Sequence, residues 1–350
     1  CRFCQAGMIY RPNREKDVER LKELARSMIA ATGHEEISLS SLSSSDYSQL
    51  EELITFLIDE CGKKKINISL PSLRIDAFSL DIMQKVQDIK KSSLTFAPEA
   101  GSQRLRNVIN KGLTIDNILD GSKQAFEGGW NKVKLYFMLG LPTETEEDMR
   151  AIPELANEIA ALYYDTVPKE KRNGKCQITI STSFFVPKPF TPFQWATMLD
   201  PGDYLGRAKI VNDHVKEQLN HKSIRYNWHE ADVTVLEGVL ARGDRKLSDA
   251  IEYVYTHGGL FDAWSDFFNY DLWLEAFAAC DIDIDFYTKR VRSDDEIFPW
   301  DFIDVGVTRE FLLREWKTAL TETVTPNCRM RCSGCGARQY GGGVCFEDKN

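Results

Sequence analysis

Residues 132–145 read Lys-Val-Lys-Leu-Tyr-Phe-Met-Leu-Gly-Leu-Pro-Thr-Glu-Thr, and this stretch decides the fold. Apolar and polar side chains alternate up to Leu139, which predicts a β-strand. Thr145, with Asp148 three residues later, is typical of the cap of a helix that continues to about Tyr163. A buried strand followed by a short connection and an amphipathic helix is the repeating unit of a parallel α/β sheet.

The alternation of strand and helix continues on both sides of this unit. Strand patterns occupy residues 36–41, 66–70, 94–97 and 178–186 in addition to 133–139, and helical patterns occupy 18–29, 47–61, 80–89, 103–109 and 115–126. Five strands separated by helices predict a parallel sheet built from right-handed crossovers. Ligands of such sheets bind at the carboxyl ends of the strands, so the segments that follow each strand form the candidate site.

The totals of the sequence limit the class of protein. A chain of 350 residues predicts two domains rather than one. Its net charge of −9 argues against a strong grip on a nucleic acid backbone by this chain alone. No apolar run reaches the roughly 18 residues that cross a bilayer, so we expect no membrane partner and a cytoplasmic location. The first residue is Cys1 rather than Met, which predicts a fragment.

The pattern changes after Pro201. Residues 201–325 are mixed helical and rich in Trp and Phe, without clear strand–helix repeats, which predicts an accessory domain behind a core of residues 1–200. The aromatic density favours a packed core over a cofactor site. Acidic stretches at 281–285 and 294–296 predict a solvated face.

Six of the nine cysteines lie near the two ends of the sequence. Clustered cysteines in a chain without a secretory signal predict metal or cluster ligands in a reducing compartment. The pair in Cys1-Arg2-Phe3-Cys4 alone permits a thioredoxin-like redox pair, half of a zinc site or part of an iron–sulfur site. A loop separates this pair from the first amphipathic helix, which disfavours the redox pair. The other clustered cysteines are Cys328, Cys332, Cys335 and Cys345.

The opening Cys1-Arg2-Phe3-Cys4-Gln5-Ala6-Gly7 resembles the second half of the C-x3-C-x2-C signature of the radical S-adenosylmethionine (SAM) superfamily, with Phe3 at its aromatic position. In that family three thiolates hold three irons of a 4Fe–4S cluster, and the fourth iron binds SAM. The resemblance implies that Cys1 and Cys4 are cluster ligands. It places the remaining ligand four residues upstream of Cys1, so we expect the chain as given to assemble the cluster poorly.

Segments after the other predicted strands resemble, in the same order, the SAM-binding segments of this family. Taken singly, each also permits a plain turn or a helix cap, and their order along the chain favours the family. The resemblance implies that Ser44, Ser45 and Asp46 hold the SAM amino group, that Glu99, Gly101 and Ser102 contact the ribose, that Arg104 pairs with the SAM carboxylate, and that Gly140 lies on the adenine side.

The resemblance covers residues 1–195 and implies an α/β fold, a partial (β/α)6 radical SAM barrel that lacks its first strand. Residues 185–192 resemble the end of the sixth strand in the subgroup related to methylthiotransferases. Residues 242–245 and 298–301, with the terminal cysteines, resemble an uncharacterised bacterial branch labelled cobalamin-binding radical SAM proteins, whose N-terminal cobalamin-type domain is absent here. This implies SAM and an electron donor such as flavodoxin or ferredoxin as partners, and methylation or methylthiolation of an RNA or protein.

The tail at residues 326–350 has the spacing Cys328-x3-Cys332-x2-Cys335-x9-Cys345, with glycines between the cysteines. Four thiolates so close together suit one metal centre, and both a structural zinc and an auxiliary 4Fe–4S cluster remain open. Two other functions stay open with them. One is a zinc-bearing adapter protein without activity, and the other is a methylthiotransferase whose terminal cysteines hold a sulfur-donating cluster.

Overall fold

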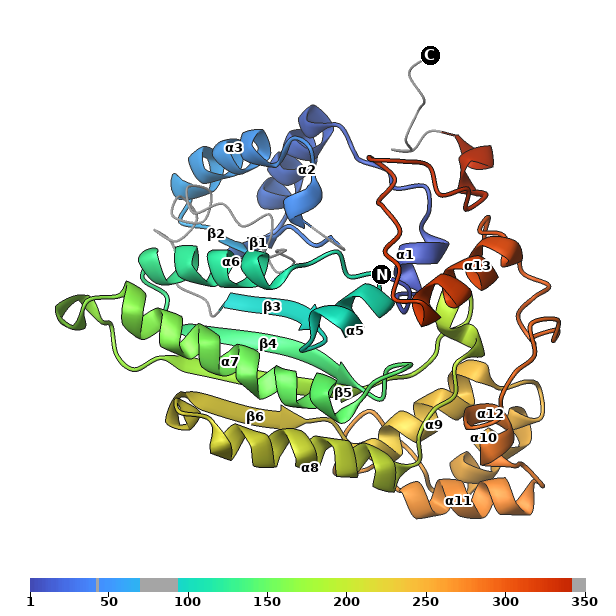
Figure 1. Cartoon of the computed structure of the whole chain (residues 1–350). Coiled ribbons are helices and arrows are strands. Elements are labelled where there is room, and N and C mark those ends of the chain that lie inside the picture. Colours follow the sequence, from blue (N-terminus) through green and yellow to red (C-terminus); the bar gives the residue numbers. More distant parts are fainter. Residues whose placement is uncertain (42–43, 70–93, 342–350) are drawn as a thin grey trace.

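The computed structural model describes residues 1–41, 44–69 and 94–341 and shows an α/β protein with parallel sheets (Figure 1). The helix predicted at 80–89 and Cys345 lie outside the described residues. The strands of the described part are β1 (Glu36–Ser38), β2 (Asn67–Ser69), β3 (Leu94–Glu99), β4 (Lys132–Leu139), β5 (Gln177–Phe184) and β6 (Ile224–Trp228).

The strands form two parallel sheets. β1 pairs with β2, and the larger sheet has the order β3–β4–β5–β6. Its register aligns one apolar row across all four strands, in which Leu94 lies opposite Val133, Val133 opposite Ile178, and Ile178 opposite Ile224. All four side chains are buried. The strand patterns of the sequence therefore describe the core correctly, because burial on the sheet is what produces the apolar alternation.

Helices cover the sheets as a parallel α/β arrangement requires. α2 and α3 pack on β1 and β2, whereas α6, α7 and α8 lie along one side of the larger sheet (Figure 1) and bury the main apolar cluster against it. The helices of the described part are α1 (Ala6–Ile9), α2 (Val18–Ala31), α3 (Leu50–Gly62), α5 (Gln103–Val108), α6 (Ile115–Glu127), α7 (Glu146–Thr166), α8 (Pro201–Glu217), α9 (Ala231–Arg242), α10 (Leu247–Thr256), α11 (Tyr270–Ala279), α12 (Ile284–Thr288) and α13 (Arg309–Leu320).

The predicted cap of α7 is present. The Asp148 carboxylate accepts hydrogen bonds from the Thr145 backbone N–H at 2.8 Å and from its hydroxyl at 3.1 Å. These bonds define where α7 begins and therefore fix the length of the connection that follows β4.

β6 is a strand that the sequence pattern did not predict. It pairs with β5, so the larger sheet continues past residue 200. Of its five residues, Ile-Arg-Tyr-Asn-Trp, only Ile224 is buried. An edge strand of this kind has no apolar alternation to reveal it.

The helices after β6 enclose an apolar cluster of their own, which includes Trp273 and Phe277. Trp264 and Phe267 are 60% and 61% exposed, so the expected packed aromatic core is only partly present. In the described ranges, we find no helix with the length and apolar character needed to cross a membrane.

Candidate iron–sulfur and SAM site

The carboxyl ends of β3, β4 and β5 meet α1, α13 and the N-terminus at one edge of the larger sheet (Figure 1). The backbone is unusual at this edge. Glu99 ends β3 with a φ of 69°, Gly140 follows β4 with a φ of 83°, and Thr143 and Phe190 have φ values of 64° and 60°. Positive φ is uncommon for residues other than glycine, and such positions cluster at binding and catalytic sites.

The cysteine loop, residues 1–5, is seated at this edge. The Arg2 backbone N–H donates to the Ile109 carbonyl at 2.9 Å, after α5. The Gln5 side chain donates to the Pro189 carbonyl at 3.2 Å, after β5. Phe3 packs against an apolar cluster that contains residues from the ends of β3, β4 and β5. Segments after separate strands therefore hold the loop in place.

Cys1 and Glu99 lie at the same site. Burial raises the pKa of Glu99, and the Lys111 ammonium acts in the opposite direction. Lys111 Nζ lies 3.1 Å from Glu99 Oε1. The structure thus brings together the predicted cluster ligand and the predicted ribose-contacting carboxylate, which are far apart in the sequence.

The thiols suit part of an iron–sulfur site. Cys1 is exposed and Cys4 is half-buried, and Cys4 Sγ accepts a hydrogen bond from the Gly7 N–H at 3.3 Å. Backbone N–H groups directed at sulfur are typical of iron–sulfur ligation. Among the described residues, no three cysteine, histidine or acidic side chains gather as a metal site. The role of Cys1 and Cys4 as cluster ligands remains a prediction.

Arg104, Ser102 and Gly101 have structural partners at the start of α7. Arg104 forms an ion pair with Asp148 and donates to the Thr143 carbonyl at 2.7 Å. Ser102 caps α5 and donates to the same Asp148 carboxylate. Burial of Asp148 opposes its charge, but the bonds from Arg104, Ser102 and the α7 cap hold its pKa below the ordinary value. The roles of these residues toward SAM remain predictions.

Two buried charged residues at this edge, Arg106 and Glu144, were not predicted from the sequence. Arg106 is fully buried and donates to the carbonyls of Ala100 at 3.0 Å and Gly101 at 2.7 Å, so it holds the turn after Glu99. Burial lowers its pKa to about 10. Charged residues are usually exposed, so no pattern in the sequence identifies Arg106.

Glu144 is the second of these residues, with a side chain that is 1% exposed. It accepts from the Gly140 N–H at 2.8 Å and from Arg207 at 2.6 Å. Burial raises the pKa of Glu144 to about 7. The carboxyl group closes the glycine turn after β4, which is the segment predicted to lie beside adenine.

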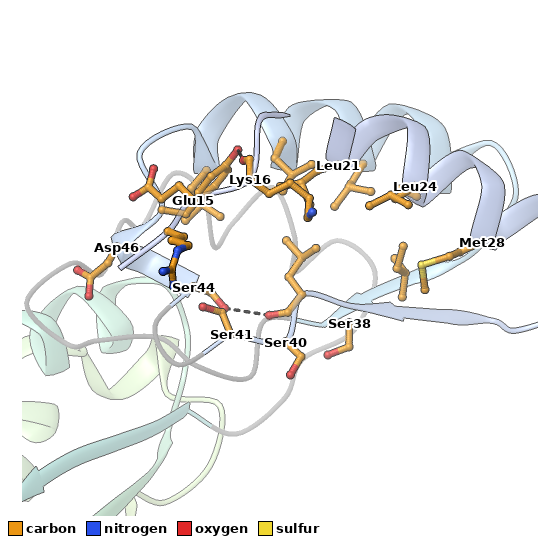
Figure 2. Close-up of a pocket in the computed structure, with 18 of the residues that line it drawn as sticks. Glu15, Lys16, Leu21, Leu24, Met28, Ser38, Ser40, Ser41, Ser44 and Asp46 are labelled. Carbon is orange, nitrogen blue, oxygen red and sulfur yellow. Dashed lines mark hydrogen bonds between the residues drawn. The ribbon is translucent and has the colours of Figure 1, made fainter. Parts of the chain in front are cut away.

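Ser44, Ser45 and Asp46 form a short 3-10 helix after β1. Ser44 is buried and donates to the Leu39 carbonyl at 2.9 Å, and Asp46 is exposed. A cavity of about 570 Å³ opens beside them, between α2, β1 and α3 (Figure 2). Apolar side chains of α2 and α3 line it together with polar residues such as Glu15, Lys16 and Ser40, and its described lining contains neither Glu99, Gly140 nor a cysteine. The cavity therefore shares none of these residues with the edge where the cysteine loop lies.

The terminal cysteines do not form a closed metal site within the described part of the chain. Cys328 and Cys335 are half-buried and Cys332 is exposed, while Cys345 falls outside the described ranges. The Thr308 N–H donates to the Cys335 carbonyl at 3.0 Å, and the Gly334 N–H donates to Cys332 Sγ at 3.4 Å. Their metal-binding role remains a prediction.

The C-terminal segment, residues 321–335, runs back to the cysteine loop. Arg2 is 1% exposed, and its Nε donates to the Glu315 carboxylate of α13 at 3.0 Å. Its terminal nitrogens donate to the carbonyls of Val108 at 3.0 Å and Thr323 at 2.8 Å and to the Thr325 hydroxyl at 3.1 Å. One side chain between the two cysteines therefore joins α5, α13 and the C-terminal segment.

The same segment reaches the 3-10 helix beside the cavity. Asn110 and Thr325 exchange two hydrogen bonds of 3.0 Å, and Arg329 lies 2.7 Å from Glu15 and 3.2 Å from the Asp46 carbonyl. Cys328 lies in the sequence between these two anchored residues, Thr325 and Arg329.

Residues 1–156 of the 350 match the Radical SAM superfamily. Members of this family are enzymes, and the family implies a 4Fe–4S cluster and SAM as cofactors. Two cysteines at the carboxyl edge of a parallel sheet agree with this match.

Two curated proteins of Methanocaldococcus jannaschii are similar to the chain. One, named "Uncharacterized protein MJ0966", is 34% identical over 253 residues, which cover 72% of this chain and 51% of the relative. The other, named "Putative methylthiotransferase MJ0865", is 28% identical over 157 residues, which cover 42% of this chain and 34% of the relative. The chain thus spans about half the length of the first relative and a third of the second.

Proposed function

We propose that the chain is the catalytic part of a radical SAM enzyme that modifies an RNA or a protein by methylation or methylthiolation. The observation that carries the proposal is the seating of the cysteine loop at the carboxyl edge of the larger sheet, beside Glu99. When bound there, the 4Fe–4S cluster supplies the electron that cleaves SAM into methionine and a 5′-deoxyadenosyl radical.

Different side chains at the edge would bind the cluster and SAM. Cys1 and Cys4 would hold two of the irons. Glu99 would accept hydrogen bonds from ribose hydroxyls, since its carboxylate is held at the end of β3 by Lys111. Gly140 would allow adenine to approach the backbone, in a turn that Glu144 closes. Arg2 would position both cysteines by tying their loop to α13.

Methylthiolation is favoured as the modification by two observations. One relative carries the name of a methylthiotransferase, and the similarity covers 42% of this chain. The C-terminal segment that carries Cys328 also contacts the cysteine loop, since the Thr325 hydroxyl accepts a hydrogen bond from Arg2 at 3.1 Å. A zinc-bearing tail without redox activity is the competing function, and cobalamin dependence is a further open prediction.

The test is anaerobic iron–sulfur reconstitution of the chain extended upstream of Cys1, followed by measurement of 5′-deoxyadenosine from SAM. We expect about four irons at the first site and product above background. Cys4→Ala should abolish both. Cys280→Ala, which changes a half-buried cysteine at the end of α11, is the matched control and should keep them. A full iron complement with no 5′-deoxyadenosine would overturn the proposal.

The tail is tested in the same extended protein. Replacement of Cys328, Cys332 and Cys335 by Ala should remove a second set of irons and leave SAM cleavage in place. Loss of zinc instead of iron would favour the structural metal. Sulfur incorporation into the product, measured by mass spectrometry, distinguishes methylthiolation from methylation.

A further inference from the structure

Two buried arginines face each other where α9 ends. Arg242 is the last residue of α9 and is 1% exposed, and Arg292, beyond α12, is 6% exposed. Burial and the positive charge of Arg292 both lower the pKa of Arg242. The two side chains donate to the neighbouring carbonyls of Thr288 and Tyr287, and Arg242 also reaches the 3-10 helix at Pro192–Trp195, which follows β5. This arginine pair belongs to no site described above.

The two guanidinium groups have more hydrogen-bond donors than the acceptors around them can satisfy. Arg242 donates only to the carbonyls of Thr288 and Gln194, each at the long distance of 3.4 Å. Arg292 donates to the Tyr287 carbonyl at 2.9 Å. Three buried nitrogens of the pair have no hydrogen-bond partner among the described residues, namely Nε of Arg242 and Nε and Nη1 of Arg292. Buried donors of this kind ordinarily find a partner.

The pair also lacks negative charge. The charged groups that act on Arg242 are Arg292, Arg290 and Glu296, which are two cations and one carboxylate. Glu296 already binds Arg290 through both oxygens, at 2.6 Å and 2.7 Å, and lies 3.8 Å from Arg292. Three guanidinium groups thus share one carboxylate. An unpaired buried charge is strongly unfavourable, and water can satisfy the donors without neutralising the charge.

We propose that Arg242 and Arg292 bind a small oxyanion of the phosphate class. Planar guanidinium groups match the oxygens of phosphate two at a time, and three unused N–H donors on two adjacent groups suit such a ligand. The low exposure of both side chains favours a free ion over a phosphate within a polymer. The proposal is independent of the function proposed above.

Bound phosphate would also stabilise the segment after β5. Gln194, whose carbonyl accepts from Arg242, accepts through its side chain from the Phe190 N–H at 3.0 Å and from Trp300 at 3.0 Å. Pro189, next to Phe190, accepts from Gln5 of the cysteine loop. A continuous set of contacts therefore connects the arginine pair to the loop that carries Cys4.

The experiment is equilibrium dialysis of the full chain with radiolabelled inorganic phosphate, at constant ionic strength set with chloride. We expect saturable binding of one phosphate per chain, together with a rise in the melting temperature that chloride does not produce. Arg292→Gln should weaken binding by about tenfold or more. Arg292→Lys keeps the charge but loses the planar fork, and we expect an intermediate loss.

Arg150→Gln is the control, since Arg150 forms only an exposed pair with Glu146 on α7 and should leave phosphate binding unchanged. Competition with adenosine monophosphate separates the sources of the ligand. Weaker competition than by unlabelled phosphate indicates a free ion, and stronger competition indicates a nucleotide. Absence of saturable binding, or equal binding by the Arg292→Gln and Arg292→Lys variants and the unchanged chain, overturns the proposal.

Discussion

The Glu144 carboxyl group is buried at the turn after β4 and has a pKa of about 7, above its ordinary value of 4.5. Because folding raises this pKa, the group contributes stability when it is protonated, below about pH 4.5, and this contribution is lost as the pH rises to 7. At about 1.4 kcal/mol per pKa unit, the effect is on the order of 3 kcal/mol.

Glu144→Gln removes this titration and keeps an oxygen for the Gly140 N–H. We expect the variant to gain stability relative to the unchanged protein between pH 5 and pH 7, as measured by urea unfolding at several pH values. A difference in unfolding free energy that is independent of pH would contradict the assignment.

Arg2 provides a second prediction at the scale of one residue. Arg2→Met leaves Glu315 as a lone buried charge, so we expect a loss of about 3–5 kcal/mol in unfolding free energy. Iodoacetamide should also alkylate Cys4 faster in the metal-free chain, as followed by mass spectrometry. The double change Arg2→Met with Glu315→Leu should recover part of the stability. An unchanged alkylation rate would show that Arg2 does not hold the loop.

Sequence patterns identified the residues at the strand ends but not their partners. Glu99 and Gly140 could be predicted to share one edge, because parallel strands place their carboxyl ends together. Glu144 and Arg106 could not be found in this way, because charged residues are usually exposed and only the tertiary fold buries these two. The ion pair between Arg104 and Asp148 also depends on the tertiary fold, so no sequence pattern predicts it.

At the scale of elements, the contact between the β3–α5 turn and α7 depends on Gly101. A Cβ atom at this position would lie 2.5 Å from the Ile152 nitrogen and 2.7 Å from the Ala151 carbonyl carbon. These are backbone atoms of a helix and cannot yield easily. We therefore expect Gly101→Ala to destabilise the protein by about 1–3 kcal/mol, as measured by thermal unfolding.

Gly206→Ala is the matched control for this prediction. Gly206 is exposed within α8, and a Cβ atom there would meet nothing within 4 Å. Alanine should stabilise this helix by about 1 kcal/mol. Equal effects of the two substitutions would show that α7 does not constrain the turn.

Elements with a buried apolar face were predictable, and the others were not. β4, β5 and α7 follow their patterns closely, because the core selects the apolar positions. β6 has one buried residue and was missed. Ser44 and Asp46 line a cavity between α2, β1 and α3, and no pattern in the sequence predicted that cavity.

At the scale of the whole molecule, the C-terminal segment contacts the cysteine loop and stabilises its position. Truncation after Glu322 removes Thr323, Thr325 and Arg329, and with them the bonds to Arg2, Asn110 and Glu15. We expect faster amide hydrogen exchange in residues 2–10, while the amides of β4 and β5 keep their protection. A chain truncated after Gly341 retains these bonds and is the control. Unchanged exchange in the loop would contradict this role.

Composition and local sequence pattern could not predict the contact between the C-terminal segment and the cysteine loop. They indicate an α/β class, a cysteine-rich tail and a separate helical region, but a contact between residues 2 and 315 depends on how every intervening element packs. The match to the superfamily covers residues 1–156 and does not include α13 or the segment after it.

The Arg2–Glu315 pair has a consequence for the order of events during synthesis. Its partners are 313 positions apart, and at about 5–20 residues per second a ribosome needs about 15–60 s to make the second after the first. Until then nothing from α13 can fasten the thiols of Cys1 and Cys4. In the nascent chain the cysteine loop is therefore without its Arg2–Glu315 contact until α13 has been made.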